Sequence, residues 1–402
     1  MTGAPAAGPP AAGLPAAGPP AAGASVLVVN AGSSSLKLRV LGARDEITAR
    51  LDLDSWDGSP DTDQLRQFLG GLAGLGAVGH RVVHGGSQFT RATVLDDSVV
   101  EAIAGLTDLA PLHQPRALAG ICAAHSALPG VPAVACFDTA FHAGMPAAAA
   151  RYALPGAWTS QFALRRYGFH GLSHGYAARR SAQLIDQDLK RLRVVTCHLG
   201  AGSSLAAVHG GRSVDTTMGF TPLEGLVMAT RSGSVDPGLL IWLLQHGGLS
   251  VAELASGLEH SSGLAGLAGL PGGSGDLREV RRAAEAGSSG ARLAIDVHAH
   301  RLRREIAAMA AAMNGLDVLT FTGGIGEHQP AVRAEAAAGL AFLGVAVDPA
   351  RNAAAAADAD ISASPGGART LVITAREDVE IARQVRAATG LPTVAGGWPA
   401  HP

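Results

Sequence analysis

Two stretches of this sequence resemble each other although they lie in opposite halves of the chain. VNAGSSSLKLRV near residue 30 and HLGAGSSLAAVHGG near residue 200 each run from an apolar strand through Gly-Ser-Ser into an alternating strand. Such a pattern is typical of a β-hairpin. A match this short also arises by chance, because Gly and Ser are ordinary hairpin residues. We nevertheless predict a duplicated chain in which each half opens with a hairpin.

Strand-like and helical segments alternate along the rest of the chain. The runs VLVVN, LRVVTCHLG and LDVLTFTGG are separated by Ala-, Leu- and Arg-rich stretches at helical spacing, which is typical of an α/β protein. The clearest helix is predicted over residues 290–313 and ends at the stop signal Asn314-Gly315. With 402 residues, 47% of them hydrophobic, the chain can build one large core or two medium ones, and we expect two domains.

Composition argues against several classes of partner. The formal net charge is −2 and no aromatic-and-basic stripe occurs, so we expect no nucleic acid. Cys122, Cys136 and Cys197 are widely spaced in apolar runs, which argues against a disulfide framework or zinc site and favours a reducing cytoplasm. Residues 1–24 repeat Pro-Ala-Ala-Gly, so that regular prolines exclude a membrane-spanning helix, and they lack the basic start of a signal peptide. We predict a disordered tail there and no membrane partner.

The first hairpin carries groups suited to phosphate oxygens. Asn30 and residues 33–35 supply polar side chains, and Gly32 allows the turn to approach a ligand closely. Lys37 follows the turn in a chain where arginine supplies 29 of 31 basic residues, which suggests selection for the compact ammonium. The alternative is an ordinary exposed strand lysine.

Two glycine-rich segments are candidates for a nucleotide site. FTGGIGEHQP follows a strand, turns at residues 323–326 and offers Pro330 as the start of the next helix, so its backbone N–H groups can face a phosphate. The same pattern also suits an ordinary strand-to-helix connection. The G-x-G-x-x-G at Gly74, Gly76 and Gly79 lies between a helix and a strand, the wrong order for a dinucleotide site, and we discount it.

Two arginines and an aspartate stand in unusual surroundings. Arg81 in GHRVVHGG and Arg231 in MATRSGSVDPG lie among glycines and apolar residues. A guanidinium offers paired donors to a carboxylate or a phosphoryl group, and the alternative is an internal ion pair with Asp or Glu. Asp138 in CFDTAFH would be costly to bury unless it serves a partner.

Histidines are frequent, fifteen in all, and leave two interpretations open. His170 and His174 are four residues apart, but Gly171 lies between them and no further ligand is near, which argues against zinc. Each of them, like His113 and His142, is either a general base or a satisfied structural histidine.

Eight motifs occur together between about residues 26 and 388: NAGSSSLK, GHRVVHGG, APLHQP, FDTAFH, RRYGFHGLSH, MGFTPLEGLVMATRSG, FTGGIGE and EDVEIARQV. On these motifs the chain resembles the acetokinase family of the actin, Hsp70 and sugar-kinase superfamily. The resemblance implies an α/β fold of two duplicated ribonuclease-H-like domains around an active-site cleft. The first would comprise residues 25–160 plus a returning helix within about 378–402, and the second, nucleotide-binding domain residues 161–377.

The resemblance also implies an activity, namely reversible in-line transfer of the ATP γ-phosphoryl group to acetate, giving acetyl phosphate and ADP without a covalent enzyme intermediate. It implies Mg²⁺ or Mn²⁺, a cytoplasmic homodimer and metabolic coupling to phosphotransacetylase. One alternative is a propionate or other short-chain acyl kinase, because one methylene discriminates by only about 1–3 kcal/mol. Another is a catalytically silent nucleotide-binding regulator of the same fold.

Carried over by position, the resemblance assigns roles to residues of this chain. The catalytic set is Arg81, Asp138, His170 and Arg231, with Arg81 also binding acetate. The methyl pocket is lined by Val83, Leu112, Phe169 and Pro222, and the metal is held by Asn30 and Glu377. The ATP contacts are Lys37, His198, Leu199, Gly200, Ala201, Gly202, Asp276, Leu277, Arg278, Gly324, Ile325, Gly326, Glu327 and His328.

Five residues depart from the family pattern. Ala201, Gln114 and His328 stand where the family usually has asparagine, Leu172 replaces threonine, and Ser234 replaces an acidic residue. Ala201 and His328 lie in the nucleotide segments and therefore bear on phosphoryl-donor preference. The sequence offers no physical account of Ser234.

Overall fold

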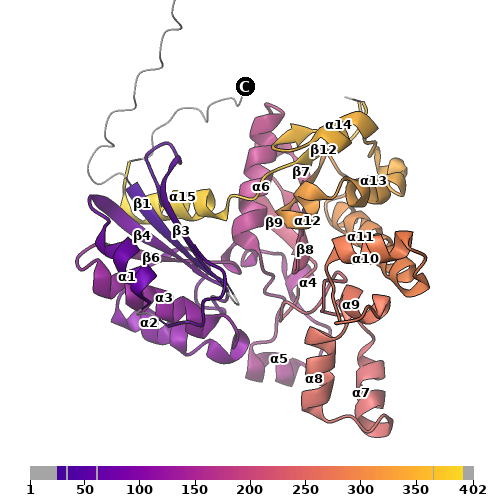
Figure 1. Cartoon of the computed structure of the whole chain (residues 1–402), viewed down its shortest axis with the longest axis horizontal. Coiled ribbons are helices and arrows are strands. Elements are labelled where there is room, and N and C mark those ends of the chain that lie inside the picture. The colour runs from indigo at the N-terminus through magenta and orange to yellow at the C-terminus, as the bar shows by residue number, and fades with distance from the viewer. Residues whose placement is uncertain (1–24, 33–34, 60–61, 365, 393–402) are drawn as a thin grey trace, which may run out of the picture.

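The computed structural model describes residues 25–32, 35–59, 62–364 and 366–392, which form two lobes, each built on a six-stranded mixed sheet (Figure 1). The predicted tail, residues 1–24, lies outside the described residues, as do Ser33 and Ser34. The first sheet has the order β3-β2-β1-β4-β6-β5. Its strands are β1 (Ser25–Ala31), β2 (Leu36–Leu41), β3 (Ile47–Leu53), β4 (Leu75–Val82), β5 (Thr93–Val94) and β6 (Ala133–Phe137).

The second sheet repeats this topology. Read from β9, its order is β9-β8-β7-β10-β12-β11. In both sheets an antiparallel three-stranded meander is followed by two parallel strands and closed by a short antiparallel edge strand. The strands are β7 (Arg193–Leu199), β8 (Ser203–His209), β9 (Arg212–Thr216), β10 (Val318–Thr322), β11 (Ala359–Asp360) and β12 (Arg369–Val372). The predicted duplication, with a hairpin at the start of each half, is confirmed.

Helices cover both faces of the first sheet, because successive side chains of β1 alternate between faces. Leu27 and Val29 pack against α1 (Asp63–Gly70) and α3 (Gln114–Ala127), with α2 (Asp97–Ala104) alongside α3. Val26 and Val28 pack against α15 (Glu377–Thr389), which lies beside β1 and β4 in Figure 1. The last described helix therefore packs on the first lobe, while the predicted domain boundaries themselves stay a prediction.

Gly79, part of the discounted G-x-G-x-x-G pattern, lies within β4. A Cβ atom there would come within 2.6 Å of the Cγ2 atoms of Ile381 and Val385. The glycine thus allows α15 to approach the sheet closely. Its role is packing, which agrees with discounting the pattern as a dinucleotide site, although β4 already begins at Leu75 and so includes Gly76 and Gly79.

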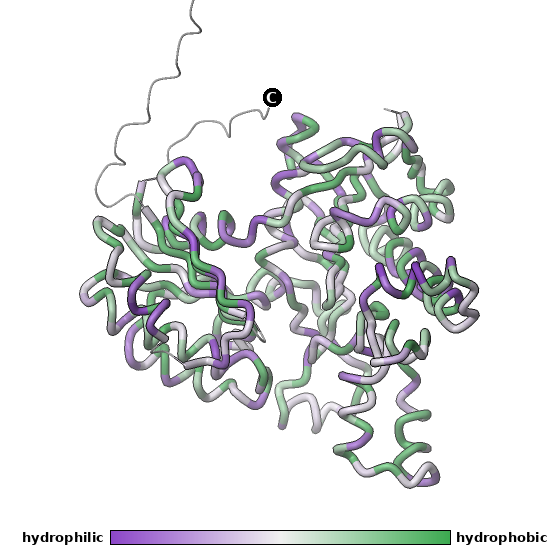
Figure 2. Tube along the Cα trace, in the orientation of Figure 1, coloured by the Kyte–Doolittle hydropathy of each residue, from purple (hydrophilic) through white to green (hydrophobic). Residues whose placement is uncertain are grey.

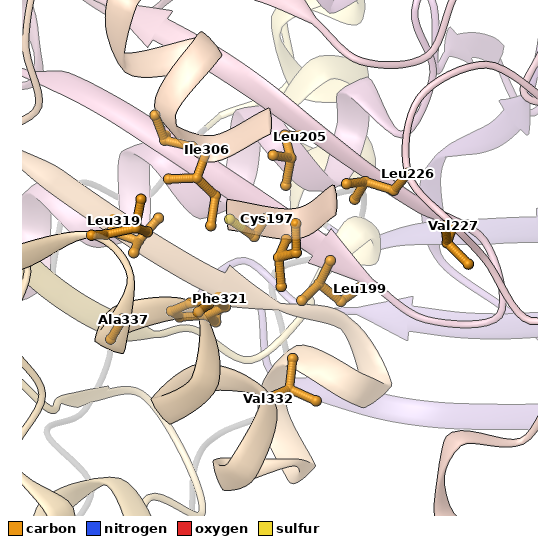
Figure 3. Close-up of a cluster of buried hydrophobic side chains, with 14 of the residues drawn as sticks. Cys197, Leu199, Leu205, Leu226, Val227, Ile306, Leu319, Phe321, Val332 and Ala337 are labelled. Carbon is orange, nitrogen blue, oxygen red and sulfur yellow. The ribbon is translucent and has the colours of Figure 1, made fainter. Parts of the chain in front are cut away.

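The second sheet is also covered on both faces. Figure 3 shows side chains of β7 and β10, among them Cys197 and Phe321, gathered with Ile306 of α11 (Ser289–Ala312) and Val332 of α13 (Pro330–Ala338). The other face packs against α6 (Gly171–Leu184). The predicted helix over 290–313 is confirmed within one residue at each end, and Pro330 begins α13 as expected.

The remaining helices of the chain lie around these two layers: α4 (Ala147–Ala150), α5 (Gly156–Phe162), α7 (Pro237–His246), α8 (Val251–His260), α9 (Gly263–Ala268), α10 (Leu277–Glu285), α12 (Gly323–His328) and α14 (Pro349–Ala354). α7 and α8 project from the body of the second lobe (Figure 1). Across the described ranges, no helix has the length and apolar character needed to cross a membrane.

Candidate active site

Three polar side chains meet where adjacent parallel strands of the first sheet end. Asn30 lies near the end of β1, Arg81 near the end of β4, and Asp138 directly after β6. Arg81 donates from Nη2 to Asp138 Oδ2 at 2.7 Å, from Nε to the same oxygen at 3.2 Å, and from Nη1 to Asn30 Oδ1 at 3.1 Å. Polar groups at the carboxyl ends of neighbouring strands are a common origin of sites in α/β folds.

Glu377, the first residue of α15, closes this network. Its Oε2 accepts from Asn30 Nδ2 at 3.0 Å and lies 3.7 Å from Arg81 Nη1. Burial disfavours the charged carboxylate, but the nearby Arg81 and the hydrogen bond from Asn30 outweigh that effect and lower the pKa of Glu377. Burial likewise opposes the charge on Arg81, and the attraction of Asp138 and Glu377 more than offsets it, so the pKa of Arg81 is raised.

The two arginines differ in their partners. Arg81 forms an internal ion pair with Asp138, whose side chain is only 1% exposed. This is the alternative interpretation that the sequence had left open. Arg231 forms no ion pair with any residue that the structure describes, and its Nη1 reaches only the carbonyl oxygen of Pro222, at 3.5 Å. Burial lowers the pKa of Arg231, because its guanidinium is partly removed from water. Most of its N–H donors therefore remain available to a ligand.

Lys37 is exposed and lies directly opposite Asn30 in the β1–β2 ladder. Opposed residues of an antiparallel pair share one face of the sheet, so the ammonium lies on the face that carries Asn30. Its charge contributes to the lowered pKa of Glu377. Lys37 therefore lies close enough to the network to act on Glu377. It is also an exposed strand lysine, as the alternative interpretation expected.

The second lobe faces this network with His170, at the start of α6. His170 has a φ of 55° and is followed by Gly171, whose N–H donates to the backbone oxygen of Asp138 at 3.0 Å. A side chain on Gly171 would collide with that same oxygen. A Cβ on Gly202 would lie 3.6 Å from His170 Nε2 and 3.7 Å from Arg231 Nη1, so both groups line the same turn between β7 and β8.

The histidines of the site are neutral at pH 7. Burial, followed by the charges of nearby histidines and of Arg81 and Arg231, holds the pKa of His170 well below its usual value. Burial also lowers the pKa of His198, whose ring centroid lies 4.3 Å from that of His170. Burial, Arg81 and Arg231 together lower the pKa of His113 to about 4. His113 was left open by the sequence, and the structure places it within the field of both arginines.

Of the four residues expected to line a methyl pocket, the structure groups two in one apolar cluster. Val83 and Phe169 belong to one small buried apolar cluster, whereas Leu112 is 50% exposed. The cluster is completed by residues that the sequence analysis did not single out: Ala110, Met218 and Met228. The signal was present, because both methionines lie in the quoted motif MGFTPLEGLVMATRSG and Ala110 begins APLHQP.

The three predicted nucleotide segments have distinct local structures. Gly200–Gly202 form the turn between β7 and β8, and residues 323–328 form the short helix α12 rather than an open turn. Asp276 caps α10 and pairs with Arg278, which lowers the pKa of Asp276 to about 2. Leu199 and Leu277 are core residues, so only their backbones remain for a ligand. The contacts of these segments with ATP stay predictions.

Three of the five departures from the family pattern have structural roles. Gln114 is fully buried, and its amide donates to the backbone oxygens of His84 at 3.1 Å and Ile103 at 3.3 Å. Leu172 belongs to the core beneath α15. Ser234 closes a loop, since its hydroxyl accepts from the N–H of Gly225 at 3.1 Å. Nothing in the structure explains Ala201 or His328.

The metal expected from the family can be tested against the donor set. No three His, Cys, Asp or Glu side chains come together to hold a metal within the described part of the chain. Mg²⁺ usually keeps several waters and takes only one or two carboxylates together with substrate phosphates. The ionised Glu377 beside the amide of Asn30 fits that mode, in which the nucleotide completes the site.

Two duplicated lobes that meet at half-buried arginines, carboxylates and a neutral histidine define a phosphotransferase of the actin-like ATPase fold. The model of the acetokinase family matches residues 62–383. The chain belongs to this family, as the sequence motifs predicted.

Relatives and solved structures agree with that assignment. An acetate kinase of Synechococcus is 48% identical over 398 residues, covering 89% of this chain and 97% of its own length. The crystal structure of Porphyromonas gingivalis acetate kinase matches with a TM-score of 0.82 at 33% identity, covering 91% of this chain and 99% of its own. A propionate kinase from Francisella tularensis matches with a TM-score of 0.80 at 36% identity, covering 90% and 98%. The predicted kinase activity and fold are thereby confirmed at the level of the family.

Proposed function

We propose that this protein is an acetate kinase that transfers the γ-phosphoryl group of ATP to acetate, reversibly, giving acetyl phosphate and ADP. The observation that carries the proposal is that His170 and Arg231 line one turn of the second lobe, while Gly171, next to His170, donates to the backbone oxygen of Asp138, the partner of Arg81. Two half-buried cations and a neutral imidazole at one place suit a small carboxylate that must approach a polyanion.

The chemistry follows from the charges. Acetate is already an anionic nucleophile, so the site needs no strong base, and the main barrier is repulsion between carboxylate and phosphate. Arg231 has donors free of any described carboxylate and holds the phosphoryl group in transit. Arg81, fixed by Asp138, orients the acetate carboxylate. An arginine acting on a transferring phosphoryl group is worth on the order of 10³–10⁵ in rate.

ATP and a divalent cation complete the reactants. Glu377 and Asn30 are the residues that would hold Mg²⁺ or Mn²⁺, which supplies neutralisation of phosphate charge when bound. Lys37, on the face of the sheet that carries Asn30, would contact the nucleotide phosphates. Residues 198–202, 276–278 and 324–328 would form the remainder of the nucleotide site.

Acyl specificity would be set by the cluster around Val83, Phe169 and Met228. A pocket of this kind separates acetate from propionate by only about 1–3 kcal/mol, so we expect some propionate to be accepted. The similarity to a solved propionate kinase keeps propionate as the second candidate substrate. The presence of Arg81, His170, Arg231 and Glu377 in the chain favours the kinase over a catalytically silent regulator.

We infer further that the protein is a homodimer. None of the ten residues of α7 is buried, although Leu239, Ile241 and Trp242 are apolar and 47–55% exposed. This projecting apolar helix is largely green in Figure 2. It packs against α8, which leaves the apolar side chains named above open to solvent. A second copy of the chain would cover these side chains. Ile241→Asp should then give a monomer by light scattering, while the exposed control Val251→Asp on α8 should not.

The cellular setting follows from the proposed product. Acetyl phosphate would be exchanged with a phosphotransacetylase and so serve acetyl-CoA formation. Cys122, Cys136 and Cys197 are all free thiols, which suits the reducing cytoplasm that we expect.

The test is a hydroxylamine trap of acyl phosphate. The purified protein would be incubated with Mg-ATP and acetate, propionate or butyrate in parallel, and with pyrophosphate or other nucleoside triphosphates as donors. We expect acetyl hydroxamate from ATP and acetate at the highest kcat/KM. No product with any donor, from folded protein that still binds ATP, would refute the kinase in favour of the regulator.

A further inference from the structure

A chain of buried hydrogen bonds runs from His170 into the second lobe. His170 Nδ1 lies 2.9 Å from the hydroxyl of Ser204, and this hydroxyl lies 2.8 Å from Nε2 of His174. His174 Nδ1 in turn lies 2.8 Å from the hydroxyl of Thr196. Ser204, His174 and Thr196 are all 0% exposed. Water therefore does not compete for these bonds, and proton positions follow from the protein groups alone.

Both imidazoles of the chain are neutral, so each carries one N–H. Burial, before any other effect, holds the pKa of His174 well below its usual value, as it does for His170. The Ser204 hydroxyl has a single proton and two histidine neighbours, so it donates to one ring and accepts from the other. The whole chain then has only two directions. In the inward direction Thr196 donates to His174, His174 to Ser204 and Ser204 to Nδ1 of His170, so that the His170 proton lies on Nε2. In the outward direction every bond is reversed, and Nε2 of His170 has no proton.

The geometry at Thr196 favours the inward direction. The alternative acceptor for its hydroxyl proton is the backbone oxygen of Ala206, at 3.5 Å, which is the outer limit of a hydrogen bond. The bond to His174 Nδ1, at 2.8 Å, has an ordinary length. An inward chain also leaves an N–H on Nε2 of His170, the nitrogen nearest the turn that Arg231 lines. That is the polarity an anionic ligand requires, because a bare nitrogen lone pair would repel it.

A second buried histidine, His142, whose ring centroid lies 5.7 Å from that of His174, shows the same arrangement with its direction settled. His142 Nε2 lies 3.0 Å from the backbone oxygen of Phe169, which can only accept, so this nitrogen carries the proton. Nδ1 must then accept from the hydroxyl of Ser213, at 2.7 Å. Ser213 also has a backbone oxygen at 3.5 Å, that of Asp215, and donates to the imidazole instead.

We propose that Ser204, His174 and Thr196 are positioning residues that orient His170 and keep its proton on Nε2, so that it donates to the transferring phosphoryl group. The inference rests on the proposed kinase function. Ser204 acts by donating to Nδ1 of His170, and His174 and Thr196 act by fixing the direction of the Ser204 proton. None of the three touches a reactant.

The first part of the test reads the protons directly. In ¹⁵N-histidine-labelled protein, long-range proton–nitrogen spectra distinguish the two tautomers of each ring. His170 and His174, assigned from single His→Gln variants, should both show the Nε2–H form, with and without Mg²⁺ and a non-hydrolysable ATP analogue. An Nδ1–H form of His170 would overturn the proposal. Because this measurement needs no turnover, it is separate from the outcome of the acyl phosphate assay.

The second part uses matched variants. Ser204→Ala removes the donor to His170 and should lower kcat about tenfold or more, with the KM for ATP little changed, because misaligning a donor to a transition state costs up to ~10²–10³ in rate. Ser213→Ala removes an equally buried hydroxyl beside His142 and should leave kcat within twofold. Equal losses in both variants would indicate a structural effect and overturn the proposal.

Thr196 supplies a further pair in case Ser204→Ala does not fold. Thr196→Val removes only the hydroxyl at nearly constant shape and should introduce a second His170 tautomer with a smaller loss of kcat. Thr196→Ser keeps the hydroxyl and should retain a single tautomer and recover most of kcat. Identical spectra for the valine and serine variants would contradict the role of Thr196.

Discussion

The two lobes share one topology but use the ends of their strands differently. In the first sheet the ends of β1, β4 and β6 carry a charged and amide network built around Arg81. In the second sheet, the ends of β7 and β10 carry His198 and Thr322, which are neutral. The second lobe contributes Arg231, which forms no ion pair with the described residues, from the loop after β9 and not from a strand end. Among the residues described, duplication thus supplied a common scaffold, and charge was concentrated in one copy.

This division has a physical reason. A buried cation tolerates burial only when carboxylates compensate it, and Arg81 has both Asp138 and Glu377 nearby. Such a paired guanidinium is rigid and serves to position a ligand. Among the described residues Arg231 forms no ion pair and has only the more distant charge of Glu259, so its guanidinium is available to bind a transient anion. A fixed arginine on one lobe and an available one on the other suit a reaction that brings two anions together.

The largest expected effect comes from removing the available arginine. Arg231→Ala should lower kcat by about 10³–10⁵ with little change in Tm, because no described ion pair is lost and the transition-state charge goes uncompensated. Arg231→Lys keeps the charge but not the paired donors, and should recover only part of the rate. The measurement is the acyl phosphate assay with thermal unfolding in parallel. Wild-type kcat in the alanine variant would remove Arg231 from the site.

Disturbing the ion pair of Arg81 should, in contrast, chiefly lower the free energy of unfolding. Asp138→Ala leaves the guanidinium of Arg81 buried without its bidentate partner, which typically costs about 3–5 kcal/mol of unfolding free energy. The double variant Asp138→Ala with Arg81→Met should recover much of that stability in urea unfolding, yet remain inactive. An unfolding free energy unchanged by Asp138→Ala would show that the pair contributes nothing to the first lobe.

The buried histidines make stability depend on pH in both lobes. Burial lowers the pKa of His80 in the first lobe to about 3 and that of His298 in the second to about 4, against about 6.5 when unfolded. The unfolded chain therefore binds more protons below pH 6.5, so the unfolding free energy is full above that pH and falls as the pH drops toward 4. The slope is at most about 1.4 kcal/mol per pH unit for each histidine.

Urea unfolding at pH 7, 6 and 5 would check this slope. Neither ring nitrogen of His80 has a hydrogen-bond partner among the described residues. His80→Leu should therefore reduce the loss of stability at pH 5 without weakening the protein at pH 7. The matched variant of an exposed histidine, His260→Leu, should keep the full slope. A pH-independent unfolding free energy would contradict the neutral burial of these rings.

More of the scaffold than of the site could be predicted from the sequence. Local signals sufficed for the duplicated hairpins and for the stop of α11 at Asn314-Gly315, because these depend on neighbouring residues. The ion pair of Arg81 and Asp138 joins residues 57 positions apart, and no local pattern specifies it. Family motifs bring these positions to notice, but only the register of β4 and β6 explains why they touch.

The apolar pocket shows the same limit. Leu112 belongs to a matched motif and was predicted to line the pocket, yet it is half exposed. Met228 was not predicted to line the pocket, yet it is only 1% exposed. Burial is a property of the packed chain, and the sequence around Leu112 contains no signal that separates the two cases. The chain of hydroxyls from Thr196 to His170 was equally invisible, since its members come from β7, β8 and α6.

The smallest expected effect concerns which lobe sets acyl specificity. Val83 comes from the first lobe, and Phe169, Met218 and Met228 come from the second. Val83→Ala removes two methyl groups beside Phe169 and should raise the ratio of kcat/KM for propionate over acetate by about tenfold, consistent with ~1–3 kcal/mol per methylene. Leu112→Ala serves as the control, because a side chain that is 50% exposed contributes little to a closed pocket, and it should change the ratio less than twofold. The assay compares both acids at subsaturating concentration. A larger change from Leu112→Ala than from Val83→Ala would show that the first lobe shapes the pocket through the loop before α3 and not through the end of β4.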